Sequence, residues 1–110
     1  MQREVLAQML RLYGFEVEIA EDGRQGVEKA VSIQPDLILT DSRMPEMSGF
    51  EAVTVIRRTE ATAKTPIIAL SAMVDGLYRK QVLDAGVNVV FSKPVDIDRL
   101  VRTIKALLSA

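Results

Sequence analysis

Three polar side chains of complementary chemistry follow three apolar runs of the chain. Asp41, Ser71 and Lys93 each stand directly after such a run and before a loop. A carboxylate can act as an acyl-phosphate nucleophile, while a hydroxyl and an ammonium group can stabilise the oxygens of a transferring phosphoryl group. The set therefore suits phosphoryl transfer, provided that the fold brings the ends of the three runs together.

Each of these residues alone has a plainer interpretation. An Asp or a Ser after a strand commonly caps a turn or a helix, and a Lys before a proline is usually solvated. The coincidence of all three residue types at matching places favours the functional interpretation.

Composition excludes several classes of function. The 110 residues include 14 Lys and Arg against 15 Asp and Glu, with a net charge of −1 and no His or Cys. Direct nucleic-acid binding needs clustered positive charge, which this balance argues against. The lack of Cys and His excludes thiol catalysis, thiolate zinc sites and most hydrolytic triads. No apolar run approaches the roughly 18 residues of a membrane span, so we expect a cytoplasmic chain without a membrane partner.

Hydrophobic periodicity predicts alternating helices and strands. Helices are expected over 3–13 and 22–32, from residue 49, over 75–86, and from Asp96 or Asp98 onward. Strands are expected over 15–20, 36–41, 67–71 and 87–91. This alternation predicts an α/β domain with a parallel sheet and helices on both of its faces.

Local signals mark several of these boundaries. Gly14 can end the first helix in the left-handed conformation, and Asp22 and Gln25 have the spacing of a capping box. The apolar residues of the last helix should face inward: Leu100, Val101, Ile104, Leu107 and Leu108. Its charged residues should face outward, as a solvated face or a partner surface: Arg99, Arg102 and Lys105.

The motifs around the three polar residues resemble those of the receiver domain of two-component response regulators. The matching segments are DLILTDSRMPEMSGFE, TPIIALSA and FSKP, with AEDGRQGVEKA and DAG, and they cover essentially the whole chain. The spacings of 30 residues from Asp41 to Ser71 and 22 from Ser71 to Lys93 are also typical of that family. The resemblance implies that residues 1–110 form one receiver domain, a flavodoxin-like doubly wound sheet with the strand order 2-1-3-4-5.

The resemblance implies a role for each site residue. Asp41 is the phospho-acceptor of a phosphorelay, taking its phosphoryl group from a histidine kinase or histidine phosphotransfer domain. Ser71 binds a phosphoryl oxygen and moves as the switch, while Lys93 pairs with the same group. Asp41 and the backbone carbonyl of Arg43 are magnesium ligands, and the Lys93–Pro94 peptide bond is expected to be cis. Such a domain is a signalling module, with self-phosphorylation and autodephosphorylation as its only reactions.

The first departure from the family concerns the start of the fold. A receiver begins with an apolar strand that ends in an acidic pair, and those acids hold magnesium. Residue 1 already matches the first helix, so we expect an N-terminally incomplete receiver without that strand or the pair, and weakened or lost magnesium binding. The strand is central in the family order, so segments 15–20 and 36–41 should lie two strand spacings of about 4.8 Å apart, too far to pair.

Three explanations of this departure stay open. Either the natural gene encodes upstream residues, or the chain rearranges or exchanges strands with a second copy in a homodimer, or it is a short receiver with four strands. Under the last two, the alternative function is a phosphorylation-independent pseudo-receiver that acts as an interaction module.

The second departure concerns the switch. Receivers usually carry an aromatic residue three positions before the strand-end lysine, and this position is Val90 here. Phe91 is one residue out of register, and side chains alternate across a strand, so Phe91 should point to the opposite face. We therefore expect Ser71 to move without aromatic gating.

Overall fold

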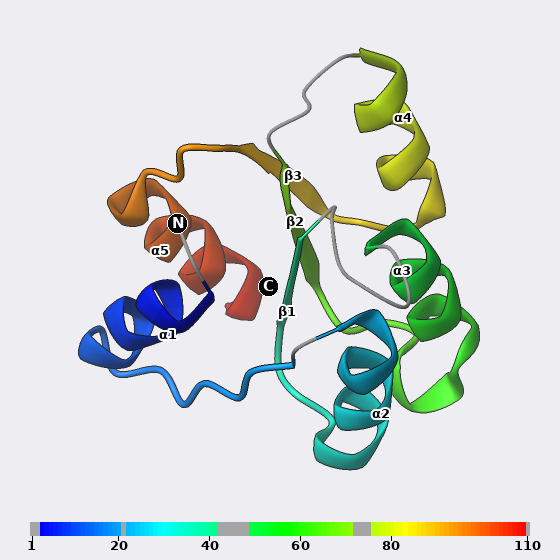
Figure 1. Ribbon diagram of the computed structural model, residues 1–110, viewed down its shortest axis with the longest axis horizontal. Helices are drawn as coiled ribbons and strands as arrows, with labels where there is room; N and C mark the ends of the chain where they lie inside the picture. The colour runs from blue at the N-terminus through cyan, green and yellow to red at the C-terminus, as the bar shows by residue number, and fades with distance from the viewer. Residues whose placement is uncertain (1–2, 21, 42–48, 72–75, 110) are drawn as a thin grey trace.

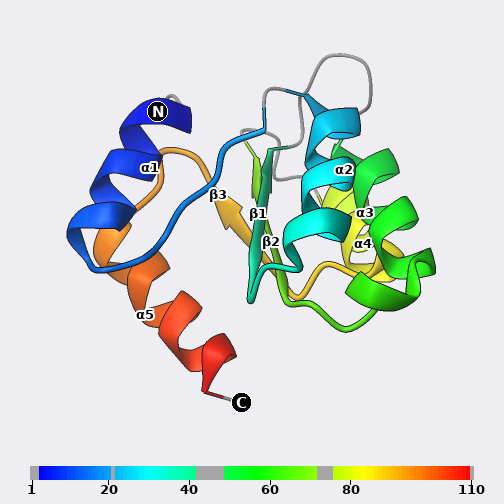
Figure 2. The ribbon, with the colours of Figure 1, turned by 90° about the horizontal axis from the view of Figure 1, so that it is seen from below.

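A parallel sheet lies between two layers of helices in the computed structural model, which describes residues 3–20, 22–41, 49–71 and 76–109. In chain order the elements are α1 (Arg3–Leu12), α2 (Gly23–Ile33), β1 (Ile38–Asp41), α3 (Gly49–Arg58), the 3-10 turn η1 (Glu60–Thr62), β2 (Ile67–Ser71), α4 (Gly76–Ala85), β3 (Val89–Ser92) and α5 (Ile97–Leu108). The strands of these residues have the order β1-β2-β3. Helices α1 and α5 cover one face, and α2, α3 and α4 cover the other (Figures 1 and 2). The predicted flavodoxin-like α/β class is confirmed.

The end of α1 and the start of α2 are marked by the residues that the sequence predicts. Gly14 follows α1 with a φ of 94°, in the left-handed region that glycine tolerates. Asp22 is the N-cap of α2, and its side chain accepts a hydrogen bond from the N–H of Gln25 at 2.8 Å. Helix α2 extends to Ile33, one residue beyond the predicted end.

Helix α5 begins after Asp96, whose side chain accepts a hydrogen bond from the N–H of Arg99 at 3.2 Å. Asp96 rather than Asp98 is therefore the cap. The outward charged face is confirmed, and so is the inward face for the buried residues Leu100, Val101 and Ile104. The inward prediction is wrong for Leu108, which is exposed because it is the last residue of the helix. Asp75, the predicted cap of α4, lies outside the described residues.

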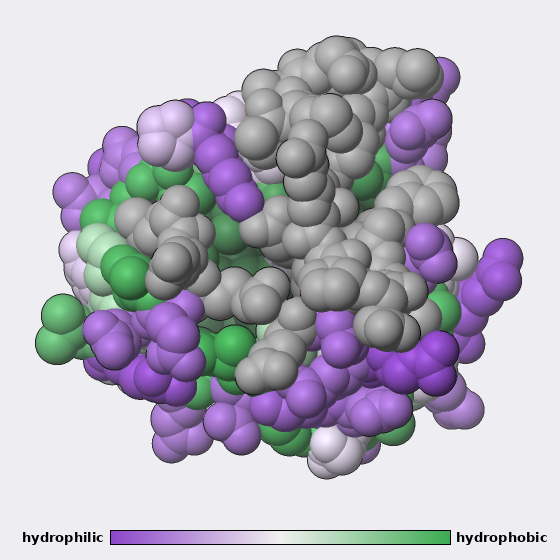
Figure 3. Space-filling view, viewed as in Figure 1, coloured by the Kyte–Doolittle hydropathy of each residue, from purple (hydrophilic) through white to green (hydrophobic). Residues whose placement is uncertain are grey.

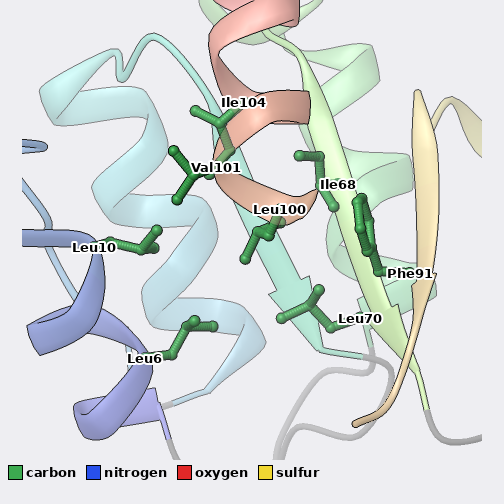
Figure 4. Close-up of a cluster of buried hydrophobic side chains, with 8 residues drawn as sticks. All are labelled: Leu6, Leu10, Ile68, Leu70, Phe91, Leu100, Val101 and Ile104. Atoms are coloured by element: carbon green, nitrogen blue, oxygen red, sulfur yellow. The ribbon is translucent and has the colours of Figure 1, made fainter. Parts of the chain in front are cut away.

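Two apolar clusters fill the space on the two sides of the sheet. The cluster under α1 and α5 is shown in Figure 4 and contains Leu6, Leu10, Ile68, Leu70, Phe91, Leu100, Val101 and Ile104. The cluster on the side of α3 and α4 contains Val53, Ile56, Ile67, Ala69, Val82, Val87 and Val90. Strand β2 contributes to both clusters because successive side chains of a strand point to opposite faces, and all five of its residues are buried.

Segment 15–20, predicted as a strand, is not one. Its alternation does report one-sided burial, since Phe15 and Val17 pack against the cluster under α1 and α5. A strand also needs a neighbouring ladder, and the sheet of the described residues stops at β1 on that side. Two side chains bond this segment instead: Arg11 donates to the carbonyl of Val17 at 2.8 Å, and Lys29 donates to the carbonyl of Ile19.

Exposed apolar side chains are present on α1 and the turn after it. Leu12 is 88% exposed, and Val5 and Tyr13 are each 45% exposed. Hydrophobic surface gathers over the α1–α5 side of the molecule in Figure 3. None of the helices in the described ranges is long and apolar enough to span a bilayer.

Arg57 on α3 ties together the amino-terminal ends of β2 and β3. Its guanidinium donates to four oxygens: the carbonyls of Gly86 at 2.9 Å, Thr62 at 3.3 Å and Ala63 at 3.1 Å, and the Oδ1 of Asn88 at 3.1 Å. The Oδ1 of Asn88 also accepts a hydrogen bond from the N–H of Ile67, the first residue of β2. Loss of solvent around Arg57 lowers the pKa of its guanidinium below the ordinary value.

We expect Arg57→Lys to lower the free energy of unfolding by about 1–3 kcal/mol, because a lysine cannot reproduce the planar fork of donors. Urea denaturation followed by circular dichroism measures this change. Arg58→Lys is the matched control, since Arg58 is exposed on the same helix and should change stability by less than about 0.5 kcal/mol. Equal losses in the two variants would contradict a special role for Arg57.

A hydrogen bond between Tyr13 and Asp98 links α1 to α5. The Tyr13 hydroxyl donates to the Asp98 carboxylate at 3.0 Å, and this bond and the negative charge raise the pKa of Tyr13 above its ordinary value.

The raised pKa of Tyr13 predicts a loss of stability in strong base. The neutral phenol is favoured in the folded chain, so its contribution is fully present below about pH 10 and is lost as the pH rises through the folded pKa. Tyr13→Phe should lower the melting temperature at about pH 9 and make little difference above the folded pKa. Asp98→Asn should weaken this pH dependence, and a Tyr13→Phe effect independent of pH would refute the explanation.

Candidate functional site

The parallel register brings Asp41, Ser71 and Lys93 to the same edge of the sheet. Asp41 ends β1 and is in register with Leu70, the residue before Ser71. Ser71 ends β2 and is in register with Ser92 of β3, and the N–H of Lys93 donates to the carbonyl of Ser71 at 2.9 Å. Neighbouring backbones at this edge are therefore one strand spacing of about 4.8 Å apart. The carboxyl edge of a parallel sheet is also where ligands bind in this class of fold.

Ser71 and Lys93 lie in different environments at this edge. Ser71 is completely buried. Every buried side-chain oxygen and nitrogen of the described residues has a hydrogen-bond partner, so the Ser71 hydroxyl is held by a hydrogen bond. Lys93 is half-buried, and its peptide bond to Pro94 is cis. The edge thus combines a fixed hydroxyl with a cation that keeps part of its contact with solvent.

Val90 and Phe91 occupy opposite faces of β3, as side-chain alternation predicts. Val90 packs in the cluster on the side of α3 and α4, whereas Phe91 packs in the cluster under α5 (Figure 4). The guanidinium of Arg99 lies over the Phe91 ring, 5.6 Å from its centroid. A cation at this distance attracts the face of the ring. Phe91 is therefore held under α5, away from the face that Val90 occupies.

The described residues do not include both magnesium ligands that the resemblance implies. Arg43, the expected carbonyl ligand, lies outside them. Within the described ranges there is no group of three or more His, Cys, Asp or Glu side chains that could hold a metal ion. The other ligand that the resemblance assigns is the carboxylate of Asp41, a side chain that also lies outside the described part of the chain.

Sequence reasoning missed two features near the site. Thr40, next to Asp41, is buried. The sequence feature that could have indicated this burial is its position as a polar residue at the end of an apolar run. Arg99 was predicted to belong to a solvated face, yet it also contacts the ring of Phe91. No local pattern indicates that contact, because a loop and a helix turn separate the two residues in the chain.

A parallel sheet between two layers of helices, with an acid, a hydroxyl and an amine at the carboxyl ends of its strands, is the arrangement expected of the receiver class of α/β domain. The family model for the response regulator receiver domain matches residues 1–105. This chain belongs to that family, the receiver domains of two-component systems. Receiver domains are signalling modules that interact with histidine kinases or phosphotransfer proteins.

Relatives of the chain include regulators and hybrid kinases. It is 35% identical over 90% of its length to the DNA-binding dual master transcriptional regulator RpaA of Synechocystis sp.. It is 39% identical over 94% of its length to hybrid signal transduction histidine kinase D of Dictyostelium discoideum. The two alignments cover 41% and 7% of those relatives, so the chain spans less than half the length of either.

Solved structures of receiver domains have the same fold. The receiver domain of a sensor histidine kinase from Pseudomonas aeruginosa PAO1, with a magnesium ion coordinated in its active-site cleft, matches with a TM-score of 0.91 and 34% identity, over 98% of this chain and 88% of that one. Chemotaxis protein CheY4 of Vibrio cholerae matches with a TM-score of 0.89 and 30% identity, over 96% of this chain and 88% of that one.

Burial of the Ser71 hydroxyl predicts a measurable cost for its removal. Ser71→Ala should lower the free energy of unfolding by about 1 kcal/mol, because a buried hydrogen bond is lost and its partner is left unsatisfied. Ser92→Ala is the matched control: Ser92 is the exposed residue that pairs with Ser71, and its loss should cost less than about 0.5 kcal/mol. Urea denaturation of both variants distinguishes the sites, and equal stabilities would contradict the prediction.

Proposed function

We propose that Asp41 accepts a phosphoryl group from a histidine kinase or a histidine phosphotransfer domain, and that phosphorylation changes which partner the domain binds. The observation that supports this is the parallel register, which brings the backbones of Asp41, Ser71 and Lys93 to one edge of the sheet. A nucleophile, a hydrogen-bond donor and a cation are the groups that a phosphoryl acceptor needs.

The transfer is one displacement at phosphorus. A carboxylate oxygen of Asp41 forms a bond to phosphorus while the bond from phosphorus to the donor imidazole nitrogen breaks, and the nitrogen keeps the electron pair. The Lys93 ammonium group offsets the negative charge of the phosphoryl oxygens, and the Ser71 hydroxyl donates a hydrogen bond to one of them. The site positions the reactants in line and needs no general base. Water later attacks the acyl phosphate, which releases phosphate and restores the carboxylate.

The switch begins at Ser71. A phosphoryl group adds about −1.5 to −2 of charge at the ends of the strands. This charge draws the Ser71 hydroxyl out of its present hydrogen bond and toward the phosphoryl oxygens. Position 90 is a valine, and Phe91 packs on the opposite face of β3, under α5 and with Arg99 over its ring. The movement of Ser71 therefore proceeds without an aromatic side chain that follows it.

We propose that magnesium is a weakly held cofactor of residues 1–110. When bound, magnesium neutralises negative charge between the acceptor carboxylate and the incoming group. It requires about six oxygen ligands in octahedral geometry. The resemblance assigns only two protein ligands within these residues, the carboxylate of Asp41 and the backbone carbonyl of Arg43, so water would supply the others.

Incubation with acetyl phosphate and magnesium tests the acceptor. Mass spectrometry should show the gain of one phosphoryl group, and Asp41→Asn should abolish it because an amide is a poor nucleophile. Asp36→Asn is the matched control, since Asp36 is an exposed carboxylate shortly before β1 and its loss should leave the gain unchanged. Lys93→Ala should slow the reaction by about tenfold or more, because a charge-stabilising group is removed.

The same experiment separates the alternatives. Weak magnesium binding predicts that the rate still rises between about 1 and 20 mM magnesium, whereas a complete site would saturate early. Phosphoryl gain that survives Asp41→Asn would refute Asp41 as the acceptor. A chain that gains no phosphoryl group, and whose partner binding ignores Asp41→Asn, would be a phosphorylation-independent interaction module.

A further inference from the structure

The outward side of α3 carries an acid, an aliphatic residue and a base in one row. Glu51, Val55 and Arg58 are exposed, and their i, i+4, i+7 spacing places them on one face of the helix. Glu51 lies in the first turn of α3 and Arg58 in the last. Val55, between them, is 38% exposed. We call these three residues the α3 stripe.

The two charges of the α3 stripe are too far apart to pair with each other. Residues 51 and 58 are seven positions apart, about 10.5 Å along the helix axis, whereas ion pairs within a helix form between residues three or four positions apart. The stripe is complementary to itself when it is reversed. A second α3 that lies antiparallel to the first places the partner's Arg58 beside Glu51 and the partner's Glu51 beside Arg58, with the two Val55 side chains near the centre. This reciprocity, in which one residue meets another and the second meets the first, is what a two-fold homodimer requires.

The α3 stripe lies at the centre of a larger face. Helix α3 is the middle helix of its layer and contacts both α2 and α4 (Figures 1 and 2). Each flanking helix adds an aliphatic side chain that is 39% exposed, Val31 on α2 and Leu83 on α4. An open groove of about 600 Å³ runs between α3 and α4, and Arg58 and Asp84 are among the residues that line it. The face therefore offers apolar side chains and a recess on the two sides of the stripe.

We propose that this face of the three-helix layer binds a second copy of the chain, with the two α3 helices antiparallel across a two-fold axis. Two Glu51–Arg58 ion pairs set the orientation, because a parallel arrangement would bring like charges together. Contact between aliphatic side chains removes apolar surface from water at the centre. The dimer does not depend on phosphorylation of Asp41.

Antiparallel α3 helices direct the two candidate sites away from each other. Helix α3 follows β1 and runs back from the carboxyl edge of the sheet. In the dimer the carboxyl edges of the two sheets therefore lie at opposite ends, and both stay accessible to a phosphoryl donor. Helices α1 and α5 cover the other face of the sheet and take no part in the contact.

The contact is small, so the dimer should be weak. A face built from three short helices buries less than the roughly 1,200 Å² in total at which stable interfaces begin. We expect a dissociation constant of about 0.1–1 mM, measured by sedimentation equilibrium on the chain at about 0.02–2 mM. Raising the NaCl concentration from about 0.05 to 0.5 M should weaken the dimer several-fold, because salt screens exposed ion pairs.

Charge reversal tests the arrangement. Glu51→Arg or Arg58→Glu alone replaces both ion pairs by like-charge contacts and should weaken self-association by about tenfold or more. The double variant restores both pairs in reversed order and should self-associate to within about threefold of the unaltered chain. A mixture of the two single variants should form a heterodimer, since each variant then meets opposite charges. Recovery on mixing also shows that the single variants are folded.

Two matched controls lie on the other face of the sheet. Glu4 is an exposed acid in the first turn of α1, and Lys105 is an exposed base in the last turn of α5. Glu4→Arg and Lys105→Glu make the same changes of charge at the same ends of a helix, so their effects on helix stability are comparable. Each should change self-association by less than about twofold.

Several results would overturn the proposal. These are a chain that stays monomeric up to about 2 mM, a dimer that Arg58→Glu leaves unchanged, single variants that do not associate when mixed, or equal weakening by the reversals and their controls. A dimer weakened only by the two control variants would place the contact on α1 and α5 instead.

Discussion

The fold depends on the position of β2 between two parallel neighbours. All five residues of β2 are buried, and they alternate between the clusters on the two sides of the sheet. Because β1 and β3 are both aligned to β2, the residues that follow the three strands reach one edge together. A slip of one residue would turn each side chain to the other face and move Ser71 along the edge. The candidate site is thus a consequence of register, set by burial of apolar side chains far from it.

The sequence allowed most helix boundaries to be predicted, because caps and left-handed stops depend on neighbouring residues. Asp22, Gly14 and Asp96 are examples. Strand β2 was also predictable from its uninterrupted apolar run. Segment 15–20 was predicted wrongly for a physical reason: alternation reports which side of a segment is buried, whereas a strand is defined by a partner elsewhere in the chain. The carbonyls of this segment are bonded by Arg11 and Lys29 instead.

The order of the site residues was predictable because each polar residue follows an apolar run. Their environments were not. The complete burial of Ser71 depends on the packing of helices on both faces, and the contact of Arg99 with Phe91 depends on how α5 returns across the sheet. Arg57 donates hydrogen bonds to Gly86 and Asn88, which lie 29 and 31 positions further along the chain. No local sequence pattern predicts hydrogen bonds over such separations.

The Arg57 network has a mechanical consequence for the sheet. It clamps the bases of β2 and β3 to α3, through the carbonyl of Gly86 and the side chain of Asn88. The opposite ends of these strands, which carry Ser71 and lead to Lys93, lie away from this clamp. A charge added at these ends therefore acts on backbone that the Arg57 side chain does not hold directly.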